Sequence, residues 1–171
     1  MIKELKDDIF FKEYKKYERC VIDYFILKCD CDISHKDIVL YSMERIKEIY
    51  DFEISINEKL MKYELIDSKD LFQIPNNYNE DKKNITSKIN KRPYWYLFLN
   101  PPYETNYTID DFIKINDILF PKGKVNLEIY DWSVDWSNYF LEGLEWWGAR
   151  CISIYDKNMD RYVVILASAT D

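Results

Sequence analysis

The chain has 171 residues, of which 47% are hydrophobic and 17% aromatic, and its formal net charge is −7. A disordered chain would lack the apolar surface that offsets the entropy of folding, so the composition excludes that class. A protein that binds a nucleic-acid backbone normally carries the opposite charge, so we expect no nucleic-acid partner.

Charged residues are spread through positions 1–28, so no apolar signal region is expected there. No uncharged stretch approaches the ~18–20 residues of a membrane span. The four cysteines suit free thiols in a reducing compartment, because a disulfide framework in a chain of this length would need more of them. We therefore expect a cytoplasmic protein with no membrane partner.

Apolar residues between positions 2 and 26 recur mostly every three or four residues, which predicts a helix. The pattern breaks near Tyr17, and either a second helix or a short strand at 21–27 could follow. Ser34 and Asp37 have the spacing of a capping box and predict a second long helix, whose apolar stripe runs to Tyr50.

Residues 50–56 alternate between apolar and polar side chains, which favours a strand, although a helix end competes. Asn57 is placed to cap a short helix through Leu65. Residues 75–93 are polar and bracketed by prolines, which is typical of a connector. We interpret residues 1–171 as one domain with a possible internal boundary at this connector.

The dense apolar run at 94–99 predicts a buried strand. Thr108 and Asp111 form a second capping box and predict a helix with a clear apolar face. Alternation at 125–130 then predicts a half-buried strand.

Two apolar segments, 149–155 and 162–167, flank a short polar segment and predict a β-hairpin. In the second segment consecutive residues are apolar, so both faces of the strand would be apolar, which predicts burial on both faces. The order of elements predicts an α+β fold, with N-terminal helices packed on a mostly antiparallel sheet of about four to five strands that ends in a C-terminal β-hairpin.

The tetrapeptide 100–103, Asn-Pro-Pro-Tyr, resembles the signature of the amino-methyltransferases. In that family the Asn side chain helps to hold the target amino group, and a Gly-rich loop approaches S-adenosylmethionine. The glycines of this chain are only Gly123, Gly143 and Gly148, all downstream and without the G-x-G spacing of such a loop. We therefore interpret the tetrapeptide as a turn that ends a strand, and we expect no cofactor.

Cys20, Cys29, Cys31 and His35 are the one cluster with metal-ligand side chains, but their spacing differs from that of paired zinc knuckles. We expect small buried thiols, an exposed histidine and no metal. Ser-His-Asp and Cys-His catalytic sites need a histidine as general base, and the chain has only one histidine. Most such sites are therefore excluded, and no catalytic residue is predicted.

The most unusual segment is 125–149, which has five acidic residues, no Lys or Arg, and four of the five tryptophans. Acidic side chains interleaved with Trp suit docking onto a basic protein, and they also suit stacking on a sugar. The structural alternative is that the Trp residues fill the core and the acids are merely solvated. The candidate partner-binding residues are Asp131, Trp132, Asp135, Trp136, Glu142, Glu145 and Trp146.

These features predict a small acidic cytosolic protein that binds and neutralises a macromolecular partner, as a toxin-immunity protein or another protein inhibitor does. The expected partner is a protein with a basic surface, because opposite fields speed encounter. The alternative is a carbohydrate-binding or glycoside-acting protein that uses the acidic Trp-rich segment 128–147.

Overall fold

A computed structural model describes residues 1–51, 53–85, 92–103 and 105–169. Six strands form one antiparallel sheet in the order β1-β2-β6-β5-β4-β3. Their bounds are Ile2–Glu4 (β1), Ile22–Cys29 (β2), Tyr63–Ile66 (β3), Leu127–Trp132 (β4), Ala149–Asp156 (β5) and Arg161–Ser168 (β6).

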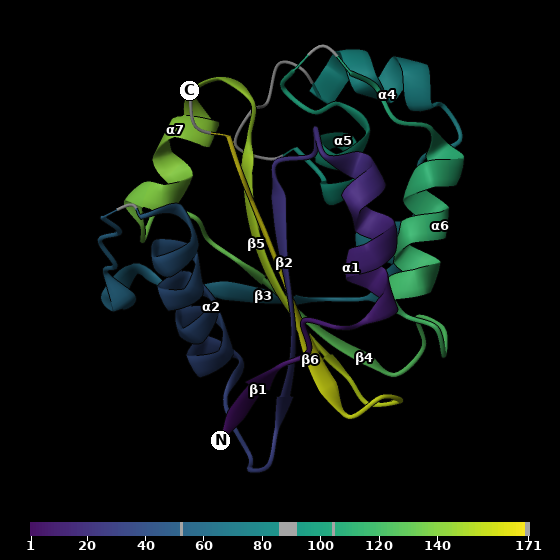
Figure 1. Cartoon of the computed structure of the whole chain (residues 1–171). Helices are drawn as coiled ribbons and strands as arrows, with labels where there is room; N and C mark the ends of the chain where they lie inside the picture. The colour runs from purple at the N-terminus through teal and green to yellow at the C-terminus, as the bar shows by residue number, and fades with distance from the viewer. Residues whose placement is uncertain (52, 86–91, 104, 170–171) are drawn as a thin grey trace.

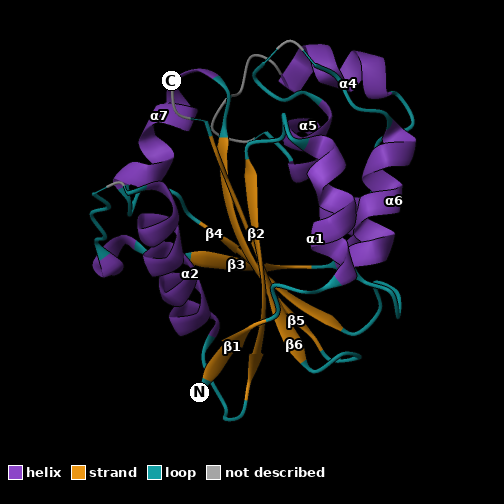
Figure 2. Cartoon of the chain, viewed as in Figure 1, coloured by secondary structure: helices purple, strands orange, loops and turns teal. Residues whose placement is uncertain are grey.

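Helices cover both faces of the sheet, so the molecule has three layers (Figures 1 and 2). On one face lie α1 (Ile9–Tyr14), α3 (Ser68–Phe72), α4 (Tyr78–Ile85), α5 (Tyr94–Leu99) and α6 (Ile109–Leu119). On the other face lie α2 (His35–Tyr50) and α7 (Asn138–Trp146). The chain also has two short 3₁₀ helices within the described residues, η1 (Lys15–Tyr17) and η2 (Glu58–Leu60). Within the described ranges, none of the helices combines the length and the apolar composition needed to cross a bilayer.

The caps predicted at Ser34 and Thr108 are confirmed. The Ser34 hydroxyl accepts a hydrogen bond from the backbone N–H of Asp37 and begins α2. Thr108 and Asp111 cap each other reciprocally at the start of α6. Each cap satisfies N–H groups that the first helical turn leaves without a partner.

The central strand β6 is buried on both faces, as its sequence predicts. Val163 and Ile165 pack into the core on the α5–α6 side, whereas Val164 and Leu166 pack into the core beneath α2. Strands β2 and β5 flank β6, so both of its edges are hydrogen-bonded. The predicted hairpin of β5 and β6 is confirmed over eight register pairs.

The run at 94–99 is a helix, not the predicted strand, and all six of its side chains are buried. A segment buried on every side has no polar positions from which its period could be read. Asn100 then ends the helix, and its side-chain amide donates to the Tyr96 carbonyl at 2.9 Å. The tetrapeptide at 100–103 therefore follows a helix end rather than a strand.

The sheet has six strands instead of the expected four to five, and helices cover both of its faces (Figure 2). The two short edge strands, β1 and β3, were not predicted. Helix α2 continues through Tyr50, and among the described residues of 50–56 only Ile56 pairs with another segment, in an isolated bridge to Ser137, so no strand forms at those positions. The predicted helix after Asn57 is limited to η2, and β3 follows it. In the connector 75–93, α4 occupies Tyr78–Ile85, and 86–91 lie outside the described residues.

Candidate functional site

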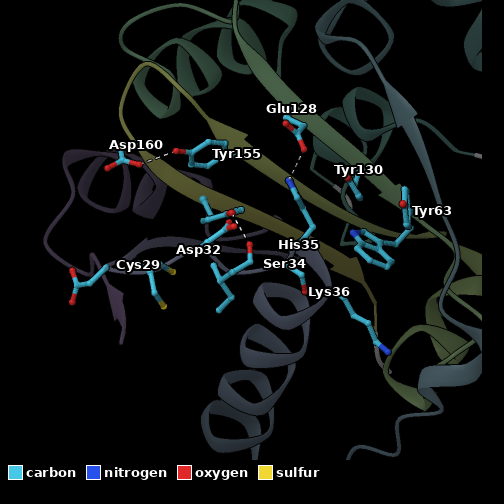
Figure 3. A pocket seen from close by; sticks show the side chains of 15 residues that line it. Cys29, Asp32, Ser34, His35, Lys36, Tyr63, Glu128, Tyr130, Tyr155 and Asp160 are labelled. Carbon is cyan, nitrogen blue, oxygen red and sulfur yellow. Dashed lines mark hydrogen bonds and ion pairs between the residues drawn. The ribbon is translucent and has the colours of Figure 1, made fainter.

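A cavity of about 670 Å³ lies beside the first turn of α2, over the sheet face that this helix covers. Four tyrosines and four carboxylates contribute to its wall, together with His35 and Lys36 from α2 (Figure 3). We call this site the acidic tyrosine pocket, defined by Tyr63, Tyr130, Tyr155, Tyr162, Asp30, Asp32, Glu128 and Asp160.

Strand geometry gathers these side chains. Glu128, Tyr130 and Trp132 are alternate residues of β4 and so point to one face of the sheet. Tyr155 of β5 lies directly opposite Glu128, and Tyr162 of β6 lies directly opposite Tyr155. Residues directly opposite each other share a face, so three strands contribute to the same wall.

Five aromatic rings follow one another along this wall. The Tyr63 ring stacks on Tyr130 with centroids 4.3 Å apart, and Tyr130 stacks on His35 at 4.0 Å with an interplanar angle of 4°. Tyr162 meets His35 edge-on at 5.3 Å, and Tyr155 is tilted against Tyr162 at 4.8 Å. Such contacts restrict the rotamers of each ring.

His35 is buried, with 7% of its side chain exposed, so the prediction of an exposed histidine is wrong. It is the first residue of α2, and the first turn of this helix rests on the sheet, so the imidazole points inward. Its Nδ1 lies 2.8 Å from the Ser153 hydroxyl, and its Nε2 lies 3.7 Å from Glu128 Oε1. Burial lowers the pKa of His35 to about 4, against the opposing effect of the Glu128 carboxylate, so the ring is neutral at pH 7.

Ser153, His35 and Glu128 are the residue types of a nucleophilic triad, but their surroundings favour a structural role. The Ser153 hydroxyl accepts a hydrogen bond from Trp132 Nε1 at 2.9 Å and can donate its own proton to His35 Nδ1. That assignment leaves a hydrogen on Nε2, on the side of Glu128. Ser153 is also fully buried, so the hydroxyl is out of reach of a substrate in the pocket.

The pocket is electronegative, because its wall contains four carboxylates and one lysine. Lys36 forms an ion pair with Glu58 at 2.8 Å, and Lys157 lies 3.4 Å from Glu128. Asp30 and Asp32 are exposed, and neither takes part in an ion pair within the described ranges.

The Tyr155 and Tyr162 hydroxyls are protonated at neutral pH and act as hydrogen-bond donors. Burial, followed by smaller effects that include the charges of Asp32 and Glu128, raises the pKa of Tyr162 to about 12. The Tyr155 hydroxyl donates to Asp160 at 2.8 Å, and the Tyr162 hydroxyl donates to the Ile33 carbonyl at 2.9 Å. The pocket therefore offers aromatic faces and carboxylate acceptors to a ligand.

The residues predicted from the acidic Trp-rich segment differ in their exposure. Trp132 and Trp136 are 6% and 1% exposed and fill the core beneath α2. Asp131 forms an ion pair with Arg150 at 2.8 Å, and burial raises its pKa against the effect of that arginine. The exposed members are Asp135, Glu142, Glu145 and Trp146.

Of the seven predicted residues, only Trp132 lines the acidic tyrosine pocket, and Glu142 lines a second cavity. The loop aspartates and Tyr63 of the pocket were missed, because single residues there carry no local pattern. A signal did exist for Tyr155 and Tyr162, since both belong to the predicted hairpin, one in each strand close to the turn.

Three members of the cysteine and histidine cluster, Cys29, Cys31 and His35, lie around the acidic tyrosine pocket, whereas Cys20 lines a different cavity. Cys20 is half-buried, and burial raises the pKa of its thiol to about 12, against a hydrogen bond with Tyr14. Cys29 and Cys31 line the pocket. Among the residues with described positions, no group of three or more His, Cys, Asp or Glu could hold a metal ion. No protein-family model matches the chain, and no curated protein sequence matches it significantly.

Proposed function

We propose that this chain is a non-enzymatic binding protein that neutralises a macromolecular partner by docking the acidic tyrosine pocket onto a basic protein surface. A toxin-immunity protein or another protein inhibitor acts in this way. The observation that carries the proposal is the convergence of four tyrosines and four carboxylates on one cavity of about 670 Å³.

The chemistry of the pocket matches arginine and lysine side chains. A guanidinium stacks on a tyrosine face and pairs with a carboxylate through two hydrogen bonds. Tyrosines supply large contact areas with few rotatable bonds and are enriched among the residues that dominate binding energy. Asp30 and Asp32 at the pocket would steer a cationic partner, and the net charge of −7 would act in the same direction.

The alternative function, binding or cleaving a carbohydrate, is less well supported. Its expected stacking platform included Trp132 and Trp136. Trp136 lies in the core, and Trp132 lines the acidic tyrosine pocket but is only 6% exposed. The tyrosine wall could still receive a sugar ring, so an oligosaccharide belongs in the same test.

The test is a titration with two probes, a short peptide that contains two adjacent arginines and the oligosaccharide chitotriose, each followed by calorimetry. We expect the peptide to bind, with an affinity that falls as salt rises from 50 to 300 mM. Tyr63→Ala and the double variant Asp30→Asn/Asp32→Asn should each weaken the binding severalfold or more. The matched control is Asp110→Asn/Asp117→Asn, two exposed aspartates of α6 on the opposite side of the sheet.

Three results would overturn the proposal: no peptide binding, equal loss in the control double variant, or preferential binding of chitotriose. The last of these would instead support the carbohydrate function.

A further inference from the structure

A second cavity, of about 550 Å³, lies where β2 begins, between the C-terminal part of α2 and helix α7. Three carboxylates line it, those of Glu18, Asp23 and Glu142, and the described part of its wall contains no Lys or Arg. Apolar side chains, among them Val21 and Ile46, form the rest of the lining. The cavity thus combines an acidic wall with an apolar one.

The Asp23 carboxylate of this cavity accepts hydrogen bonds from two tyrosines. Its Oδ1 accepts a hydrogen bond from the Tyr50 hydroxyl at 2.8 Å, and its Oδ2 accepts one from the Tyr139 hydroxyl at 2.9 Å. Burial raises the pKa of Asp23 even though both hydrogen bonds oppose that shift. Each carboxylate oxygen has a second lone pair, so Asp23 retains acceptor capacity for a cationic donor.

Ser168 gives an independent indication that a ligand belongs here. It is the last residue of β6, only 7% of it is exposed, and it lines the same cavity. Its hydroxyl oxygen is buried and has no hydrogen-bond partner in the described structure. A Cβ added to Gly143 of α7 would lie 2.7 Å from this oxygen, so the helix backbone closes that side. Leaving a buried hydroxyl unsatisfied is costly, and a donor in the cavity would remove that cost.

We propose that this cavity binds a small aliphatic diamine or polyamine, with one ammonium group hydrogen-bonded by Asp23 and Ser168. An ammonium has three N–H donors and no acceptor, and the polar groups of the wall offer acceptors. The alkyl chain packs against Val21 and Ile46, and the exposed carboxylates of Glu18 and Glu142 attract the second ammonium. The site is separate from the acidic tyrosine pocket, with which it shares no lining residue.

The test is a calorimetric titration of the intact chain with cadaverine, and with the neutral analogue 1,5-pentanediol. We expect one cadaverine site per chain and no binding of the diol. Asp23→Asn should weaken the affinity at least about tenfold, as expected for a hydrogen bond to a charged group. Glu142→Gln and Ser168→Ala should weaken it severalfold. Glu128→Gln, which alters the acidic tyrosine pocket instead, is the matched control and should leave the affinity unchanged.

Thermal melts of each variant show whether it folds. If Asp23→Asn does not fold, Glu142→Gln decides, because Glu142 is exposed on α7 and its replacement leaves the core intact. The proposal is overturned if cadaverine does not bind, if the diol binds equally well, or if Glu142→Gln and Ser168→Ala both keep the wild-type affinity. It is also overturned if Glu128→Gln alone weakens binding, since the amine would then occupy the other pocket.

Discussion

Because His35 is buried, the free energy of unfolding is expected to depend on pH between about 6.5 and 4. One substitution at this position separates the effect of His35 from that of all other titrating groups. His35 is the single histidine of the chain, and its ring is neutral and packed between Tyr130 and Ser153. The variant His35→Gln keeps a side chain of similar size that can still hydrogen-bond Ser153, but it does not titrate. The difference between the two proteins therefore reports the protonation of this one ring.

The sign and size follow from the two pKa values. Burial lowers the pKa of folded His35 to about 4, whereas the unfolded chain has the ordinary value of 6.5. Between these values the unfolded state binds more protons, so the free energy of unfolding falls as the pH falls. The stabilisation is complete above pH 6.5 and is lost progressively toward pH 4. From pH 7 to pH 5 we expect a loss of about 1–2 kcal/mol.

The assay is urea unfolding at pH 7, 6 and 5, followed by tryptophan fluorescence. The two proteins can be compared when the free energy of unfolding falls with urea concentration at the same slope in both. The wild-type protein should lose about 1–2 kcal/mol more than His35→Gln over this range. Carboxylates such as Asp23 and Asp131 titrate in both proteins and cancel in the difference. Parallel pH profiles for the two proteins would show that His35 is not buried in the neutral form, and the reasoning would fail.

Four further outcomes are expected. Trp136→Ala should lower the free energy of unfolding by about 3–5 kcal/mol in urea unfolding, because the ring is fully buried. Asp135→Lys combined with Glu145→Lys should change that free energy by only about 0.5 kcal/mol per site or less, while stopped-flow mixing should show slower association with a basic partner. Deleting 161–171 removes the central strand and should abolish the cooperative thermal melt. Gly143→Ala should lower the melting temperature, since its Cβ would lie 2.5 Å from the Gly148 carbonyl oxygen.

Local chemistry in the sequence was sufficient to predict several elements. The caps at Ser34 and Thr108 were readable because they depend on side chains three residues apart. The β5–β6 hairpin was readable because a polar turn separates two apolar runs. Helix α5 could not be predicted in this way, because a run of six apolar residues is equally typical of a buried strand.

The candidate site was harder to predict because it depends on which strands are neighbours. Glu128 and Tyr155 are directly opposite in the sheet, yet no local pattern shows that β4 pairs with β5. The acidic Trp-rich segment was a true compositional signal, but composition alone could not show that two of its tryptophans, Trp132 and Trp136, pack in the core. His35 was placed at the correct helical position, but the direction of its side chain depends on how α2 rests on the sheet.

The strand order has a consequence for synthesis on the ribosome. Strand β2 is made early, yet one of its two partners is β6, the last strand in chain order. Until β6 emerges, the pair β1–β2 and the group β3–β4–β5 have no strand that joins them into one sheet. Folding must therefore wait for pairing between distant segments, which is slow and leaves nascent chains prone to aggregation.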